Sequence, residues 1–135
     1  MNNNNFIEFS FPKITTTITN GVEKKELKGI PPKWTSFNKS YITAKDKCRA
    51  VLTGKKSNIT VLDFDDVEDY DNIIVQHPEL KNNYTVKSNK GYHIYFLYNA
   101  ALKTGVDCFK SYNKIDIRND DGLIIAPPYY ISIIR

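Results

Sequence analysis

The chain has 135 residues, of which 41% are hydrophobic and 25% charged, and its formal net charge is +4. These proportions are typical of a globular domain, and they exclude collagen, a coiled coil and a wholly disordered chain. No apolar run approaches the roughly 18 residues of a membrane-spanning helix, and the N-terminus lacks the pattern of a secretory signal. We therefore expect one domain over 1–135, inside the cell and away from the membrane. Cys48 and Cys108 are expected to be buried or semi-buried thiols in a reducing compartment.

Charge is distributed unevenly along the chain. Residues 1–60 carry 11 Lys and Arg against 4 Asp and Glu, a net of +7, whereas residues 61–135 carry 8 against 11, a net of −3. A basic part joined to an acidic part favours a polyanion-binding surface beside a carboxylate site. A solvated surface whose two parts differ by chance is the alternative.

Hydrophobic periodicity and turn residues predict an α+β fold dominated by antiparallel strands. The Asn20-Gly21 dipeptide between two extended runs predicts a tight hairpin. Pro78 predicts the end of the longer helix. In chain order we expect a polar tail over 1–5, strands over 6–11, 14–19 and 22–27, a helix over 42–52, a basic turn over 54–57, a strand over 59–64, a helix over 67–77, strands over 84–87 and 92–98, a strand pair over 115–118 and 123–126, and a final strand over 129–134.

Two carboxylates end the clearest strand, at Asp63 and Asp65. Residues two apart on a strand project from the same face, so these like charges would repel each other unless a cation lay between them. Mg²⁺ or Mn²⁺ is the natural partner of such oxygen ligands. The alternative is a solvated acidic strand end that leads into a helix N-terminus.

A third carboxylate, Asp116, lies within an apolar strand, two residues before Arg118. An aspartate between two isoleucines is costly to bury without a partner. Either the two side chains form an ion pair of their own, or Asp116 is a further metal ligand and Arg118 is directed at a phosphate.

His93 lies in an aromatic strand just after Gly91. A lone histidine in such a strand is commonly a packed, hydrogen-bonded residue. The functional alternative is a phosphate contact near the carboxylates.

The order and spacing of these segments resemble the archaeo-eukaryotic primase superfamily, and within it the bifunctional primase–polymerase domains of large DNA viruses and plasmids. The resemblance covers residues 30–128. Its motifs are Gly54–Ser57, Val61–Asp65, Gly91–Phe96, Ile115–Arg118 and Gly122–Pro128.

The resemblance implies an RRM-like antiparallel sheet with a helix over 54–135, a small N-terminal α/β unit over 6–53, and an active site in the cleft between them. It implies that Asp63, Asp65 and Asp116 hold two Mg²⁺ or Mn²⁺ ions and that His93 contacts the nucleotide phosphates. It also implies a single-stranded DNA template, nucleoside triphosphates and, in cis or in trans, a superfamily 3 helicase as partners. Further nucleotide contacts are expected from Arg118, Lys90, Ser88, Lys55 and Lys56.

Two other functions compete with a primer-synthesising enzyme. One is a non-catalytic module that binds single-stranded nucleic acid by stacking bases on Tyr92, Tyr95 or Tyr98. The other is a metal-dependent nuclease, because carboxylate clusters also cleave phosphodiesters.

Overall fold

The computed structural model describes residues 6–88, 90–126 and 132–133. It contains one α-helix and two short 3-10 helices among ten strands in these ranges. The elements are β1 (Glu8–Phe11), β2 (Lys13–Thr19), β3 (Val22–Lys28), η1 (Trp34–Ser36), β4 (Cys48–Leu52), β5 (Ile59–Phe64), α1 (Val67–Gln76), η2 (Pro78–Asn82), β6 (Thr85–Lys87), β7 (Tyr92–Leu97), β8 (Ile115–Arg118), β9 (Leu123–Ala126) and β10 (Ser132–Ile133).

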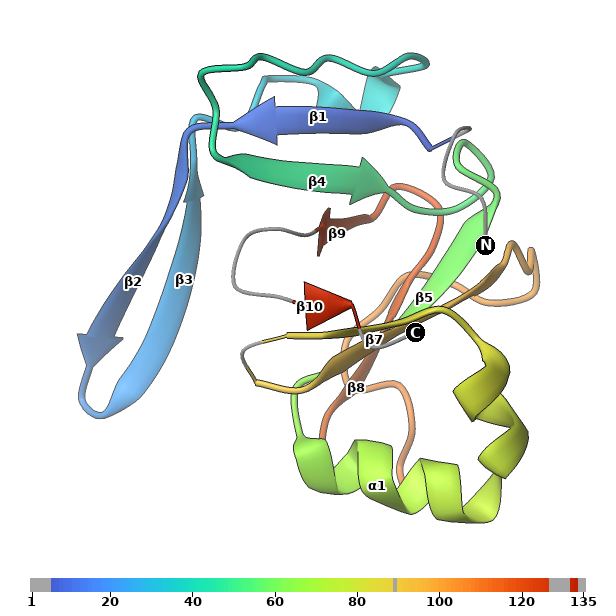
Figure 1. The fold of residues 1–135 in the computed structure, drawn as a ribbon. Coiled ribbons are helices and arrows are strands. Elements are labelled where there is room, and N and C mark those ends of the chain that lie inside the picture. The colour runs from blue at the N-terminus through green and yellow to red at the C-terminus, as the bar shows by residue number, and fades with distance from the viewer. Residues whose placement is uncertain (1–5, 89, 127–131, 134–135) are drawn as a thin grey trace.

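The described strands form three sheets, and every strand pair within them is antiparallel. The largest sheet has the order β10-β6-β7-β5-β8, a second has the order β1-β4-β9, and β2 pairs with β3 alone. Figure 1 shows α1 below the five-stranded sheet, β1 and β4 above it, and the β2–β3 hairpin to one side. The architecture is therefore α+β, as the sequence predicts, but the α/β unit expected over 6–53 is wrong, since these residues form strands and one 3-10 helix and no α-helix.

Two apolar clusters cover the two faces of the five-stranded sheet. Val61 and Tyr95 pack with residues of β4 and β9 in the space between the sheets. Leu62 and Phe64, which alternate with Val61 along β5, pack on the other face with Tyr70 and Ile73 of α1. β5 is buried along its whole length because both of its faces are covered and β7 and β8 flank it.

The hairpin and the longer helix form as predicted. Asn20 and Gly21 both have positive φ angles, 54° and 77°, which a two-residue type I′ turn requires. The carboxylate of Asp66 accepts a hydrogen bond from the Glu68 backbone N–H and caps α1 at its N-terminus. The helix ends at Gln76, just before His77 and Pro78.

The helix predicted over 42–52 is wrong. Cys48–Leu52 is instead a strand at the centre of the β1-β4-β9 sheet. Its residues are buried on both faces, so the apolar positions form a nearly continuous run. Such a short run does not distinguish a strand from a buried helical turn by its period.

The strand pair predicted for 115–118 and 123–126 is also wrong. β8 pairs with β5, whereas β9 pairs with β4 in the other sheet. Residues 119–122 therefore carry the chain from one sheet to the other instead of closing a hairpin.

The remaining expectations have mixed outcomes. Cys48 is buried, but Cys108 is exposed, because it lies in the long connection between β7 and β8 rather than against a sheet. Of the final strand expected over 129–134, only β10 falls within the described residues, where it pairs with β6. The tail over 1–5 lies outside them. In the described part of the chain, no helix is long and apolar enough to cross a membrane.

Candidate active site

Strand register brings three of the predicted site residues into one row. Asp63 on β5 is paired with His93 on β7 and with Asp116 on β8. Directly paired residues share a face of the sheet. This is the face of Val61, which looks toward β4 and β9. All three side chains are buried, so the row lies at the edge of the core between the two larger sheets.

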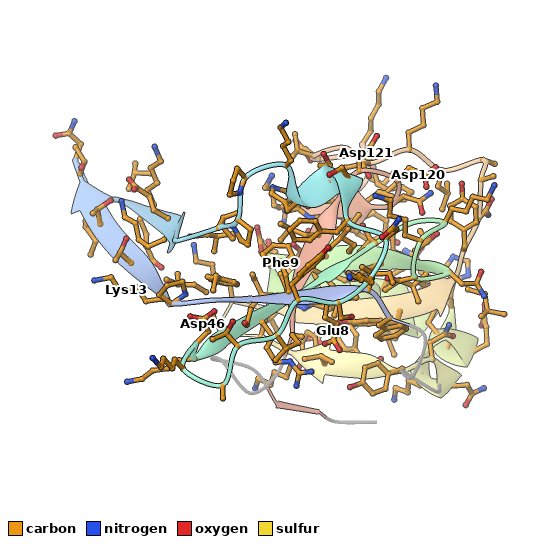
Figure 2. The ribbon with its side chains drawn as sticks, turned by 90° about the horizontal axis from the view of Figure 1, so that it is seen from above. Glu8, Phe9, Lys13, Asp46, Asp120 and Asp121 are labelled. Carbon is orange, nitrogen blue, oxygen red and sulfur yellow. The ribbon has the colours of Figure 1, made fainter. Side chains whose placement is uncertain are left out.

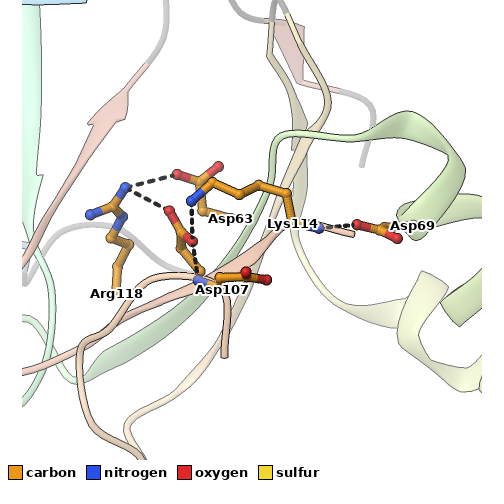
Figure 3. A network of polar contacts seen from close by, with 6 residues as sticks. Asp63, Asp69, Asp107, Lys114 and Arg118 are labelled. Carbon is orange, nitrogen blue, oxygen red and sulfur yellow. Dashed lines mark hydrogen bonds and ion pairs between the residues drawn. The ribbon is translucent and has the colours of Figure 1, made fainter. Parts of the chain in front are cut away.

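Arg118 joins the two aspartates of this row. Its Nη2 lies 3.3 Å from Asp63 Oδ2 and 3.4 Å from Asp116 Oδ2, and Figure 3 shows the Arg118 guanidinium beside Asp63. His93 Nε2 lies 3.4 Å from the other oxygen of Asp63, Oδ1. Arg118 thus contacts both aspartates. The contact with Asp116 is the ion pair that the sequence indicates as one of two interpretations.

The second carboxylate oxygen of Asp116, Oδ1, also has two partners. The Asp107 backbone N–H donates a hydrogen bond to Asp116 Oδ1 at 2.7 Å, and Lys114 Nζ lies 3.2 Å from the same oxygen. The hydrogen bond to Asp116 raises the pKa of Lys114. The carboxylate is therefore fixed between two cationic side chains.

Charge is balanced differently at Asp63 and Asp65. Burial alone would raise the pKa of Asp63, but contacts with His93 and Arg118 outweigh it and leave the pKa below its usual value. Asp65 follows β5 and is exposed. Its pKa is raised by desolvation of the carboxyl and then by the like charges of Asp63 and Asp116, against which Lys114 and Lys90 lower it. The three carboxylates therefore influence one another, and the two lysines compensate Asp65 less than His93 and Arg118 compensate Asp63.

We expect Asp65→Asn to stabilise the fold slightly at neutral pH. A carboxyl whose pKa is raised by folding binds its proton more tightly in the folded state, so its charged form costs stability as the pH rises through that pKa. Because Asp65 is exposed, the gain should stay below about 1 kcal/mol. Urea unfolding of both proteins at pH 7 and pH 3 checks this: the difference should be present at pH 7 and absent at pH 3.

A pocket of about 360 Å³ opens over Asp63 and His93 of the row, but not over Asp116, and its two walls differ in chemistry. One wall is polar, and it contains Asp63, His93 and Arg118. The other is apolar and comes from β9 and the base of the β2–β3 hairpin. The lining residues are Ile14, Leu27, Asp63, Asp65, Ser88, Lys90, His93, Arg118, Leu123, Ile124 and Ile125.

Ser88 and Lys90, which precede His93, both reach this pocket. Ser88 Oγ accepts a hydrogen bond from the Gly91 backbone N–H, and Lys90 Nζ lies 3.8 Å from Glu23 Oε1 of the hairpin. Gly91 lies so close to β5 that an added Cβ would be 1.8 Å from the carbonyl oxygen of Phe64. Only glycine allows this approach, which places the turn beside the end of β5.

We expect Gly91→Ala to destabilise the fold by about 3 kcal/mol, because the methyl group would meet rigid backbone. Gly105→Ala is the matched control, since the nearest atom to its Cβ would be the Cys108 sulfur at 3.2 Å. Urea unfolding midpoints of both variants measure the difference. Equal midpoints would show that the close approach is unimportant.

Lys55 and Lys56 are not part of this pocket. They line a second pocket of about 580 Å³, with Trp34, Asp120 and Asp121. Figure 2 shows the two aspartates near the top of that view, with Lys13 and Asp46 toward the left and below them. The structure therefore does not bring these two lysines to the carboxylate row.

The tyrosines expected to stack on bases have other contacts. Tyr95 is buried in the core between the sheets. The Tyr92 ring is stacked on the Tyr70 ring of α1, with 3.8 Å between the ring centroids. The Tyr98 hydroxyl donates a hydrogen bond to Asp120. A stacking platform built on Tyr95 is therefore excluded by its burial.

The comparison with protein families decides where the chain belongs. Residues 28–132 match the family described as bifunctional DNA primase/polymerase, N-terminal. The chain belongs to this primase/polymerase family. A search of curated proteins finds no match. The resemblance stated from the motifs is confirmed, and at the level of the family the chain is a primase/polymerase-type nucleotidyltransferase.

Membership of this family implies a requirement for divalent metal ions. The question is whether the carboxylates of the candidate site could hold them. In the described ranges, no three His, Cys, Asp or Glu side chains are grouped closely enough to hold a metal ion. The cation between Asp63 and Asp116 is instead the Arg118 guanidinium. The donor chemistry nevertheless fits a hard divalent ion. Asp63 Oδ1 is buried and accepts no hydrogen bond from the residues that the structure describes, although His93 Nε2 lies 3.4 Å from it, and the pKa of Asp65 stays raised despite Lys114 and Lys90.

Two buried polar residues near this candidate site were not predicted from the sequence. Asp69 of α1 is buried and accepts hydrogen bonds from the backbone N–H groups of Asn113 and Lys114, just before β8. Asn119 follows β8, is fully buried, and donates to the carbonyls of Asn99 and Leu102. Asp69 lies among acidic residues and Asn119 among turn residues, as exposed polar residues commonly do. No local sequence signal therefore marks either of them as buried.

Proposed function

We propose that this chain is a metal-dependent nucleotidyltransferase that makes or extends primers on a single-stranded DNA template. The observation that carries the proposal is the row of Asp63, His93 and Asp116 beside one pocket, in a chain of the primase/polymerase family. In this proposal the whole chain is one catalytic domain, and its active site is the pocket between the two larger sheets. A superfamily 3 helicase in cis or in trans is the proposed partner.

Asp63, Asp65 and Asp116 are the proposed holders of Mg²⁺ or Mn²⁺. Bound there, the ions would supply the positive charge that activates a primer 3′-hydroxyl and neutralises the triphosphate. The support is the buried Oδ1 of Asp63, which accepts no hydrogen bond within the described ranges, and the raised pKa of Asp65, which a nearby cation would relieve. Until an ion binds, the Arg118 guanidinium balances the charge of the two buried carboxylates, Asp63 and Asp116.

His93 and Arg118 are the proposed binders of the nucleotide phosphates. His93 Nδ1 and Arg118 Nε are buried, and neither has a hydrogen-bond partner among the described residues. Both residues line the pocket, and a planar guanidinium is well suited to phosphate oxygens. Lys90 and Ser88, on the same polar wall, would add a cation and a hydroxyl donor. The orientation of these groups before the substrate arrives is what they contribute to the reaction.

A synthesis assay on single-stranded DNA tests the proposal. The folded protein is incubated with template, Mg²⁺ or Mn²⁺, and ribonucleotides or deoxynucleotides, and the products are resolved by length. We expect new or extended strands that disappear when the metal is chelated. A parallel incubation of labelled DNA with metal and no nucleotide tests for a nuclease. Cleavage without synthesis, or DNA binding without either, would overturn the proposal.

A further inference from the structure

The β2–β3 hairpin is a projecting element with two exposed strands. Each strand has seven residues, and among the described strands each pairs with the other alone. Figure 2 shows the hairpin standing away from the two larger sheets, with Lys13 near its base. The family match begins at residue 28, so nearly all of the hairpin precedes the matched region. Membership of the family therefore assigns it no role.

One side of the hairpin faces the pocket of the candidate site. Register pairs Ile14 with Leu27, and both line that pocket. Ile18 and Glu23 are paired on the same side, and Glu23 reaches Lys90 on the polar wall at 3.8 Å. The hairpin is thus anchored beside the site at its base and near its turn.

The opposite side of the hairpin is rich in lysine and threonine. It carries three lysines against one glutamate, and that glutamate, Glu26, forms an ion pair with Lys28 at 2.8 Å. Lys13 and Lys28 are directly opposite each other in register. Like charges in this position are unfavourable unless an anion lies near them, and within the hairpin Glu26 provides one for Lys28. The residues on this side are Lys13, Thr15, Thr17, Thr19, Val22, Lys24, Glu26 and Lys28.

We propose that this lysine–threonine side, which is turned away from the pocket, binds the phosphate backbone of single-stranded DNA outside the pocket. Ammonium groups and hydroxyls are the donors that protein surfaces offer to phosphate oxygens. The core of a protein interface is typically depleted of charged residues, whereas this side carries three lysines and one glutamate and has Val22 as its one aliphatic residue. The inference rests on the proposed function in one respect: it takes single-stranded DNA as the ligand.

Salt-dependent DNA binding tests this interaction. Fluorescence anisotropy of a labelled single-stranded oligonucleotide is measured with the full chain at several KCl concentrations, without metal or nucleotide. The variant is K13A/K24A/K28A. Removing one lysine–phosphate interaction lowers the slope of log affinity against log salt by about 0.7, so removing three lowers it by about 2. We expect affinity at low salt to fall on the order of tenfold.

The matched control is K81A/K103A/K110A, which removes the same charge from residues outside the hairpin and should keep the wild-type slope. The variant K13R/K24R/K28R keeps the positive charges and should show the wild-type slope. It therefore distinguishes an effect of lost charge from an effect of a misfolded hairpin. An unchanged slope in the alanine variant, or an equal fall in the control, would overturn the inference. Loss of primer synthesis does not enter this measurement, so failure of the proposed function is recognised separately.

Discussion

Replacing Asp63 by asparagine is expected to lower nucleotide incorporation by at least about 10²–10³-fold, the size of effect seen when one preorganised electrostatic group is removed from an active site. Asp63 is at the centre of the row, where it contacts both His93 and Arg118. The amide cannot hold a divalent ion by charge, and it leaves Arg118 with Asp116 as its remaining carboxylate. Steady-state incorporation rates on a primed template measure the loss.

Asp71→Asn is the matched control for this change. It makes the same chemical replacement on the exposed side of α1, away from the pocket, and should keep the wild-type rate. Circular dichroism confirms that both variants are folded. Undiminished synthesis by folded Asp63→Asn would remove Asp63 from the active site.

Replacing Asp69 by alanine is expected to cost about 2–4 kcal/mol of unfolding free energy. Its two carboxylate oxygens accept hydrogen bonds from the backbone N–H groups of Asn113 at 2.9 Å and Lys114 at 2.6 Å. Alanine leaves both donors without this partner in a partly buried place, and hydrogen bonds to charged groups are worth about 1.5–3 kcal/mol each. Guanidinium chloride unfolding gives the free energies.

Glu68→Ala is the comparison for this prediction, because Glu68 is the exposed neighbour in the same helical turn and should change stability by no more than about 0.5 kcal/mol. Asp69 also fixes the segment from which Lys114 reaches Asp116. Equal unfolding midpoints for the two variants would show that the buried carboxylate does not hold this segment.

Local pattern predicts much of this fold and of its candidate site. Asn20-Gly21 specifies a turn through its backbone angles, and Asp66 and Pro78 mark where α1 begins and ends. The spacing of Asp63 and Asp65 after an apolar run identifies an acidic strand end. Each of these signals depends on neighbouring residues, so it can be recognised without knowledge of the tertiary structure.

Other features depend on pairing between distant segments. Cys48–Leu52 is a strand because β1 and β9 lie on its two sides, and nothing within those five residues states that. The row that joins Asp63, His93 and Asp116 depends on the register of three strands. Arg118 reaches Asp63 as well as Asp116 for the same reason. Register is set by which faces are buried, and that is a property of the whole fold.

The most direct test of the account is calorimetric titration of Mn²⁺ into the wild-type protein and into Asp63→Asn, with no nucleotide or DNA present. We expect the wild-type protein to bind Mn²⁺ saturably, and Asp63→Asn to bind it at least about tenfold more weakly. Equal affinity in the two proteins, or no binding by the folded wild-type chain, would contradict the claim that Asp63 and the carboxylates beside it form a metal site.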